Sequence, residues 1–137
     1  AFWHRARLWS ETGDHERAVA DFTRVLKLDP GHVGALNMRG VAHGELKRHD
    51  AAVADFTAAI RLDPTDSAPV FNRGLALLRT RKPKEAEADF TRAIELDPTD
   101  PAALVQRGFA RLDQRANEGA AEDFTRAIEL NPKSARA

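Results

Sequence analysis

Hydrophobic positions recur along this chain at steps of three and four residues, and each run ends at a proline. Counting back from Pro30, Phe22 lies eight residues before it, Leu26 four and Leu28 two. This spacing places the apolar side chains on one face of an α-helix, which the proline cannot continue. The same pattern leads to three further prolines, at positions 64, 98 and 132. The sequence therefore predicts helices over residues 16–28, 50–62, 84–96 and 118–130.

A second helical stretch precedes each of these helices. The sequence predicts it over residues 2–12, 34–46, 68–80 and 102–114, with Asp66 and Asp100 as N-caps of the last two. Glycine recurs in the middle of this stretch, at Gly40, Gly74 and Gly108. A mid-helix glycine costs about 1 kcal/mol relative to alanine, so its recurrence predicts a close approach of the two helices. We expect that contact to face the alanines of the second helix (Ala52, Ala86, Ala120).

The two-helix pattern returns every 34 residues without insertion or deletion. The second half of its second helix, with the proline that follows, reads DFTRVLKLDP at 21–30, DFTAAIRLDP at 55–64, DFTRAIELDP at 89–98 and DFTRAIELNP at 123–132. A unit of this length with Leu-x-x-x-Gly, Ala-x-x-x-Phe and a terminal proline resembles the tetratricopeptide repeat. The second unit is the cleanest copy: Leu36, Gly40, Ala52, Phe56, Pro64. The first lacks its opening two residues and has Ala6 in place of the glycine.

The resemblance covers essentially the whole chain and implies an all-α fold, a right-handed α-solenoid of four stacked helix-turn-helix units. The units are residues 1–32, 33–66, 67–100 and 101–134, within a single domain of residues 1–137. Residues 135–137 would begin a further helix, so we interpret the chain as a piece of a longer protein. No single unit can bury its own apolar face, so we interpret the repeated residues as those that pack neighbouring units together. Function is then expected at the positions where the units differ.

One departure from the family recurs in every unit. Family members usually carry leucine before the glycine, but this chain has arginine there, and an aspartate follows 16 residues later. The residues are Arg5 with Asp21, Arg39 with Asp55, Arg73 with Asp89, and Arg107 with Asp123. We expect one arginine–aspartate pair per unit, joining its two helices, and the repeated Thr23, Thr57, Thr91 and Thr125 are taken to share this structural role. The alternative is a row of arginines that binds an acidic ligand.

The resemblance also implies that the first helices of the units line a concave groove. Its predicted surface is apolar with interleaved amides, which is typical of a site for a peptide or a partner helix. The candidate residues are Asn37, Met38, Val41, Phe71, Asn72, Leu75, Leu78, Arg79, Val105, Gln106, Phe109 and Leu112. Alternatively, several of them pack between neighbouring helices, above all Phe71, Leu75 and Phe109.

Some family members bind acidic C-terminal peptides of chaperones through a clamp of lysine, arginine and asparagine. At the corresponding positions this chain has Asn37 and Val41, then Asn72, then Ala102 and Gln106. The cations are missing, which disfavours that class of ligand. A basic stretch, RTRKPK at 79–84, lies in a turn and is followed at once by acidic residues. We interpret it as a solvated turn rather than a phosphate or acidic-partner site.

Composition narrows the function further. The chain carries 21 basic and 21 acidic residues, which argues against nucleic-acid binding, and it has no cysteine. No apolar run approaches a membrane span. The five histidines form no metal set, and neither a catalytic nucleophile with its base nor a glycine-rich phosphate loop is visible. We therefore expect no enzyme activity, no cofactor and no metal. The compartment is not determined, with the cytoplasm slightly favoured.

The expected function is a non-catalytic scaffold that holds a peptide or helix of a partner protein in the groove. Two alternatives stay open. One is self-assembly through uncapped solenoid ends, because the outer face of the last helix (Phe124, Ile128) lacks a cover in this sequence. The other is a tether for an enzyme domain elsewhere in a longer protein.

Overall fold

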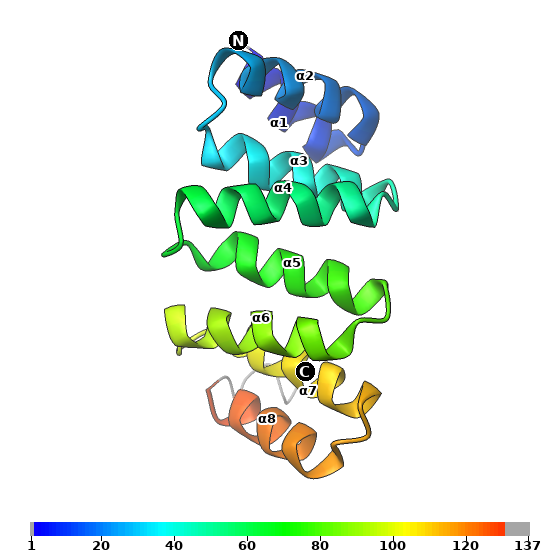
Figure 1. The fold of residues 1–137 in the computed structure, drawn as a ribbon, viewed down its shortest axis with the longest axis vertical. Coiled ribbons are helices and arrows are strands. Elements are labelled where there is room, and N and C mark those ends of the chain that lie inside the picture. Colours follow the sequence, from blue (N-terminus) through cyan, green and yellow to red (C-terminus); the bar gives the residue numbers. More distant parts are fainter. Residues whose placement is uncertain (1, 131–137) are drawn as a thin grey trace.

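Eight α-helices follow one another within residues 2–130 (Figure 1). The computed structural model of the protein describes residues 2–130, and within that range it has no strand. The helices are α1 (Phe2–Thr12), α2 (His15–Leu28), α3 (Val33–Glu45), α4 (His49–Leu62), α5 (Ser67–Arg79), α6 (Pro83–Leu96), α7 (Pro101–Asp113) and α8 (Asn117–Leu130). The predicted all-α stack of four helix-turn-helix units is confirmed. The further helix expected at 135–137 lies outside the described residues.

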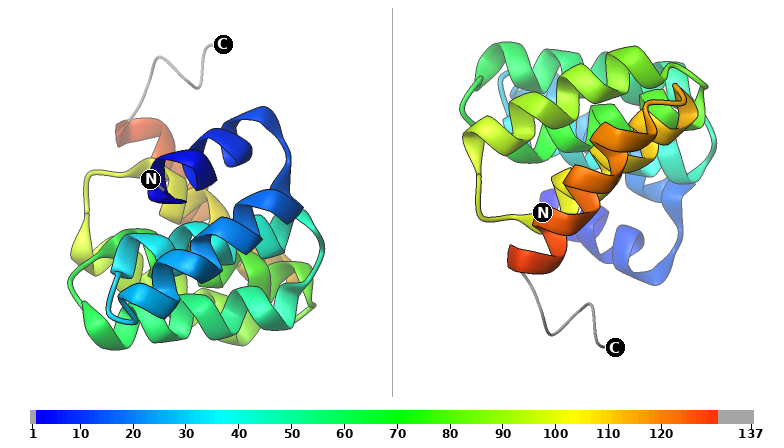
Figure 2. Two further views of the ribbon diagram at one scale, coloured as in Figure 1. Left: turned by 90° about the horizontal axis from the view of Figure 1, so that it is seen from above. Right: turned by 90° about the horizontal axis from the view of Figure 1, so that it is seen from below.

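The helices form four pairs, α1/α2 to α7/α8, stacked along the long axis of the molecule (Figure 1). Each helix packs against the helices before and after it. The odd-numbered helices also contact one another (α1 with α3, α3 with α5, α5 with α7), whereas within residues 2–130 the even-numbered helices do not. Seen along the axis, successive pairs point in different directions (Figure 2). Because helices on the inside of a curve are closer together, α1, α3, α5 and α7 form the inner face.

Most helices begin one residue earlier than the sequence pattern predicts, and the inner ones from α3 on also end one residue earlier. For α5 and α7 the predicted caps explain the earlier start. Asp66 accepts a hydrogen bond from the Ala68 amide and Asp100 from the Ala102 amide, so each helix begins directly after its cap. Two helices then begin at proline (α6 and α7), which is tolerated in the first turn because the N–H there has no partner within the helix.

A phenylalanine ring fills the space beside the mid-helix glycine in each of the last three pairs. A Cβ added to Gly40, Gly74 or Gly108 would lie 2.6–2.7 Å from the nearest ring atom. The predicted close approach is therefore confirmed, but its nearest partner is the ring (Phe56, Phe90, Phe124) rather than the alanines. Those alanines are nevertheless fully buried beside it. The ring, as the larger group, sets the distance between the helices.

The arginine–aspartate pairs form in all four units. In each pair the arginine Nε and Nη2 donate to the two carboxylate oxygens over 2.7–2.9 Å. The aspartates are only 3–6% exposed. Hydrogen bonds from Arg5, opposed in part by burial, lower the pKa of Asp21 below its ordinary value. The alternative, a row of arginines that binds an acidic ligand, is not supported because each guanidinium already holds a carboxylate.

The same arginines also connect neighbouring pairs of helices. The free Nη1 of Arg39 donates to Thr23 of the preceding pair over 3.3 Å, and Arg73 to Thr57 and Arg107 to Thr91 do so equally. The expected structural role of Thr23, Thr57 and Thr91 is thus confirmed, and it consists of linking one unit to the next.

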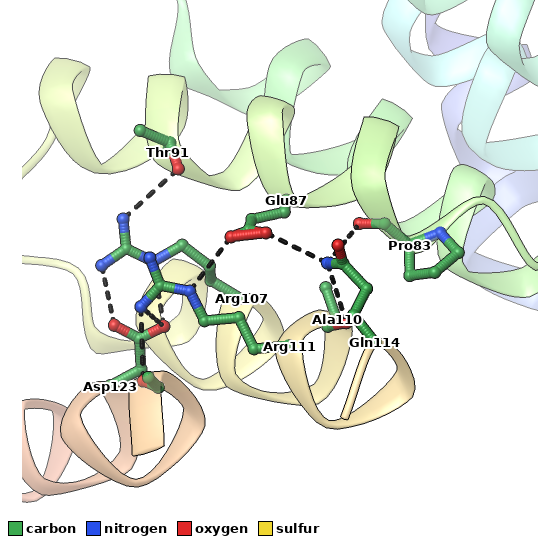
Figure 3. A network of polar contacts seen from close by, with 9 residues as sticks. Pro83, Glu87, Thr91, Arg107, Ala110, Arg111, Gln114 and Asp123 are labelled. Carbon is green, nitrogen blue, oxygen red and sulfur yellow. Dashed lines mark hydrogen bonds and ion pairs between the residues drawn. The ribbon is translucent and has the colours of Figure 1, made fainter. Parts of the chain in front are cut away.

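The joint between the third and fourth pairs carries an additional polar network (Figure 3). Arg111 donates to Glu87 of α6 over 3.1 Å and to Asp123 of α8 over 2.9 Å. Gln114 also donates to Glu87, over 3.0 Å. At the preceding joint the equivalent positions are apolar, Val53 and Leu77, and they pack in one cluster. The joints are therefore alike in geometry but different in chemistry.

Replacing Asp89 by asparagine will test the energetic role of the pairs. We expect Asp89→Asn to lower the free energy of unfolding by about 2 kcal/mol, because Arg73 loses its charge-assisted hydrogen bonds. In an Arg73→Leu background the same change will cost clearly less. Urea denaturation of the four proteins of this cycle measures both values, with Asp113→Asn as the control for an exposed carboxylate. Equal costs in the two backgrounds would contradict a coupled pair.

The glycine contact gives a second prediction. Gly74→Ala will destabilise the protein by about 1–3 kcal/mol, because its Cβ would lie 2.7 Å from the Phe90 ring and outweigh the better helix propensity of alanine. Gly44→Ala is the matched control, since its nearest neighbour is the end of the Arg79 side chain at 3.9 Å. We expect that variant to be neutral or slightly more stable in thermal denaturation. Equal losses for both glycines would refute the steric explanation.

Candidate functional site

The inner face carries all twelve residues that the sequence singled out, on α3, α5 and α7. Four are exposed: Val41, Arg79, Phe109 and Leu112. The other eight are half-buried: Asn37, Met38, Phe71, Asn72, Leu75, Leu78, Val105 and Gln106. The candidate set therefore divides into side chains available to a partner and side chains that also support the fold.

Several of the half-buried residues belong partly to the core. Phe71, Leu75 and Leu78 pack against the buried cluster that contains Phe90, and Phe71 meets the Phe90 ring edge-on with centroids 5.7 Å apart. Phe71 and Leu75 thus match the alternative interpretation as packing residues. Phe109 does not, because it is 47% exposed although one side of its ring contacts Phe124.

Apolar side chains that are exposed or half-buried lie on α3, α5 and α7 of the inner face. Val41 of α3 is 37% exposed, and Phe109 and Leu112 of α7 are 47% and 42% exposed. Between them, α5 contributes the half-buried Leu75 and Leu78. Side chains of this kind on adjacent elements are typical of an interaction surface, because their apolar area stays in contact with water in the free protein.

The amides of the inner face are partly used within the protein. Asn72 Nδ2 donates to Asn37 Oδ1 over 3.0 Å, which ties α5 to α3. The two residues are 35 positions apart, one more than the repeat length, so the sequence period gave no signal for this contact. A partner that hydrogen-bonds to either amide would have to share or replace this bond.

A pocket of about 200 Å³ opens between α5, the end of α6 and the start of α7. Its apolar wall consists of Ala68, Phe71, Ala93 and Ala103. Its polar rim consists of Ser67, Asn72, Asp97 and Asp100. Only Phe71 and Asn72 were among the predicted site residues. The others lie at the start of α5, at the turn after α6 or at buried helix positions. The one signal that could have found them is the pair of aspartates on either side of a proline turn in DPTD (97–100).

The basic turn between α5 and α6 is exposed at each of its four cations. Arg79, Arg81, Lys82 and Lys84 have no carboxylate within ion-pair distance among the described residues. Arg81 has a positive φ of 61°, as do Lys47 and Arg115 at the same position of neighbouring pairs, with φ of 61° and 63°. The turn is therefore a solvated connection, as expected, but within the described residues its cations form no ion pair with the acidic residues of α6.

Other kinds of site find no support in residues 2–130. That part of the chain has no group of three or more potential metal ligands. It also has no helix long and apolar enough to cross a membrane.

The outer face of α8 is partly as expected: Ile128 is 53% exposed, but Phe124 is half-buried against Gly108 and Phe109.

Comparison with known proteins agrees with this geometry. Among solved structures, MamA 41-end from Desulfovibrio magneticus RS-1 superposes with a TM-score of 0.91 at 27% identity, covering 96% of this chain and 74% of that one. The first TPR of Spaghetti (RPAP3), bound to the HSP90 peptide SRMEEVD, gives 0.72 at 29% identity over 74% and 80%. YrrB, a TPR protein with an unusual peptide-binding site, gives 0.83 at 25% identity over 96% and 68%.

Among curated protein sequences, no relative matches the chain. The family profile of the tetratricopeptide repeat, in contrast, matches residues 5–67 and 71–135 and so spans nearly the whole sequence. Together with the eight stacked helices of residues 2–130, this match shows that the chain belongs to the tetratricopeptide-repeat family.

Proposed function

We propose that the chain is a non-catalytic protein-interaction module that holds a peptide or helix of a partner protein on its inner face. The observation that carries the proposal is the set of apolar side chains left in contact with water on α3 and α7, Val41, Phe109 and Leu112. Burial of such area is the main favourable contribution in most protein associations. The half-buried Leu75 and Leu78 of α5 provide the floor between them.

The similar structures support a binding role for this face. One of them, the RPAP3 repeat domain, is bound to a peptide, and another, YrrB, is described by its peptide-binding site. The chain departs from a site for acidic tails, because Asn37, Ala102 and Gln106 occupy the positions where the chaperone-binding clamp has its cations. The proposed ligand is therefore a peptide or helix anchored mainly by apolar side chains.

Self-assembly by head-to-tail stacking is less favoured by the geometry. At two internal joints an alanine of the inner helix packs against the alanine and phenylalanine of the preceding helix pair. These contacts are Ala76 with Ala52 and Phe56, and Ala110 with Ala86 and Phe90, and all six residues are buried. The equivalent residue of α1 is Leu8, which is 57% exposed. A second copy stacked on α8 in the same register would force this larger side chain against Ala120 and Phe124.

Peptide selection on the isolated chain will test the proposed function. Display libraries of random peptides should yield binders of the wild-type protein. A Val41→Ser/Leu112→Ser variant should lose them by about tenfold or more in affinity, because two exposed apolar anchors are removed. A Leu28→Ser/Leu62→Ser variant, which removes exposed leucines from the outer helices α2 and α4, is the matched control.

Circular dichroism of both variants shows whether the helices are retained. Loss of the selected peptides only in the Val41/Leu112 variant supports the inner face as the site. Equal loss in both variants, or selected peptides that still bind the Val41/Leu112 variant, would place the interaction elsewhere.

A further inference from the structure

The pocket between α5 and α7 joins an aromatic wall to two carboxylates. Its apolar lining consists of Phe71 and three alanines, and its polar lining includes Asp97, Asp100 and the Asn72 amide. Its volume of about 200 Å³ is too small for a helix, but it suits one long side chain. A ligand in this pocket would meet apolar surface along its length and negative charge at its end.

Both carboxylates have local structural duties that use one oxygen each. Asp97 Oδ1 accepts from the amide and hydroxyl of Thr99, and Asp100 Oδ1 accepts from the Ala102 amide. Within residues 2–130 no arginine, lysine or histidine lies within ion-pair distance of either. The negative charge of the pocket is therefore not neutralised by the described part of the chain.

The same place at the first joint is filled by the protein itself. Trp3 stands at the position of Phe71, and its indole packs on His32, with centroids 4.6 Å apart, and beside Gly34. His32 in turn stands at the position of Asp100 and caps α3 through Nδ1. At the joint of α5 and α7 a smaller ring and a carboxylate replace the indole and the imidazole. Because these side chains are smaller, a pocket stays open at this joint. Its lining carries negative charge where the first joint has two stacked aromatic rings.

We propose that this pocket receives a cationic side chain, an arginine or lysine, of the peptide held on the inner face; the inference rests on the proposed function. The aliphatic part of that side chain packs on the alanines, and its charge lies over the Phe71 ring and against Asp97 and Asp100. Arg5 is exposed but paired with Asp21. Of the other exposed charges on the inner helices of residues 2–130, three are acidic (Glu11, Glu45, Asp113) and two are basic (Arg7, Arg79), which fits this preference. The ligand is thus a basic rather than an acidic peptide.

Three blocked peptides test the assignment: Ac-Leu-Ala-Xaa-Ala-Leu-NH2, in which Xaa is arginine, norleucine or glutamate. Each is titrated into the isotope-labelled protein, and the backbone amide shifts of Ser67, Phe71 and Asn72 are followed by NMR. We expect the arginine peptide to bind about fivefold to tenfold more tightly than the norleucine peptide, because it alone forms charge-assisted hydrogen bonds. This advantage will shrink at high salt, and the glutamate peptide will bind most weakly.

Asp97→Asn and Asp63→Asn form a matched pair of variants. Asp63 makes the same turn bonds, to the amide and hydroxyl of Thr65, but does not line the pocket. Asparagine keeps the accepting oxygen in both turns, so both variants should fold. We expect Asp97→Asn to remove the advantage of the arginine peptide and Asp63→Asn to preserve it.

The possible outcomes separate this inference from the proposed function. If the norleucine and arginine peptides bind the inner face equally, or if the two variants behave alike, the cationic pocket is refuted while the apolar groove stands. If none of the three peptides shifts the pocket amides, the cationic pocket is refuted as well. The proposed binding to the inner face is then tested only by the peptides selected from the display libraries.

Discussion

The contact of a phenylalanine ring with the backbone of a glycine determines how each pair of helices is built. Because Gly74 has no Cβ, α5 can approach α6 until the Phe90 ring lies against it, and a single methyl group would be too much. The contact recurs in three pairs with nearly the same geometry. Pairs built alike present similar packing faces to one another, so they stack into a continuous solenoid and leave a continuous inner face.

A polar spine accompanies this apolar contact. A buried carboxylate is costly unless it is paired and hydrogen-bonded, and each aspartate here receives both nitrogens of an arginine fork. The third nitrogen extends the link to a threonine of the preceding pair. The arginines are thereby committed to the fold. The joints are free to vary around this spine, as the apolar Val53–Leu77 contact and the charged Glu87–Arg111 contact show.

This division of labour places function on the residues that differ between units. The repeated residues supply the packing contacts and the arginine–aspartate pairs. The inner face, in contrast, changes from Trp3 to Phe71 at one repeat position and from His32 to Asp100 at another. The three joints differ accordingly: Trp3 packs on His32 at the first, Asn72 bonds to Asn37 at the middle one, and a pocket opens beside Phe71 at the last. A ligand that lies along the inner face would therefore meet three chemically distinct joints.

The sequence by itself determined the eight helices of residues 2–130, their boundaries to within one residue, the family and the arginine–aspartate pairs. These features depend on local capping and on a strict period of 34 residues, which the chain displays directly. Only the tertiary structure decided which groove residues are available. Phe71 and Phe109 are both aromatic residues of inner helices, yet the first packs into the core and the second is half exposed. The Asn37–Asn72 bond and the pocket around Asp97 and Asp100 were likewise not predictable, because they join residues of different units whose distance is set by the packing and curvature of the whole stack.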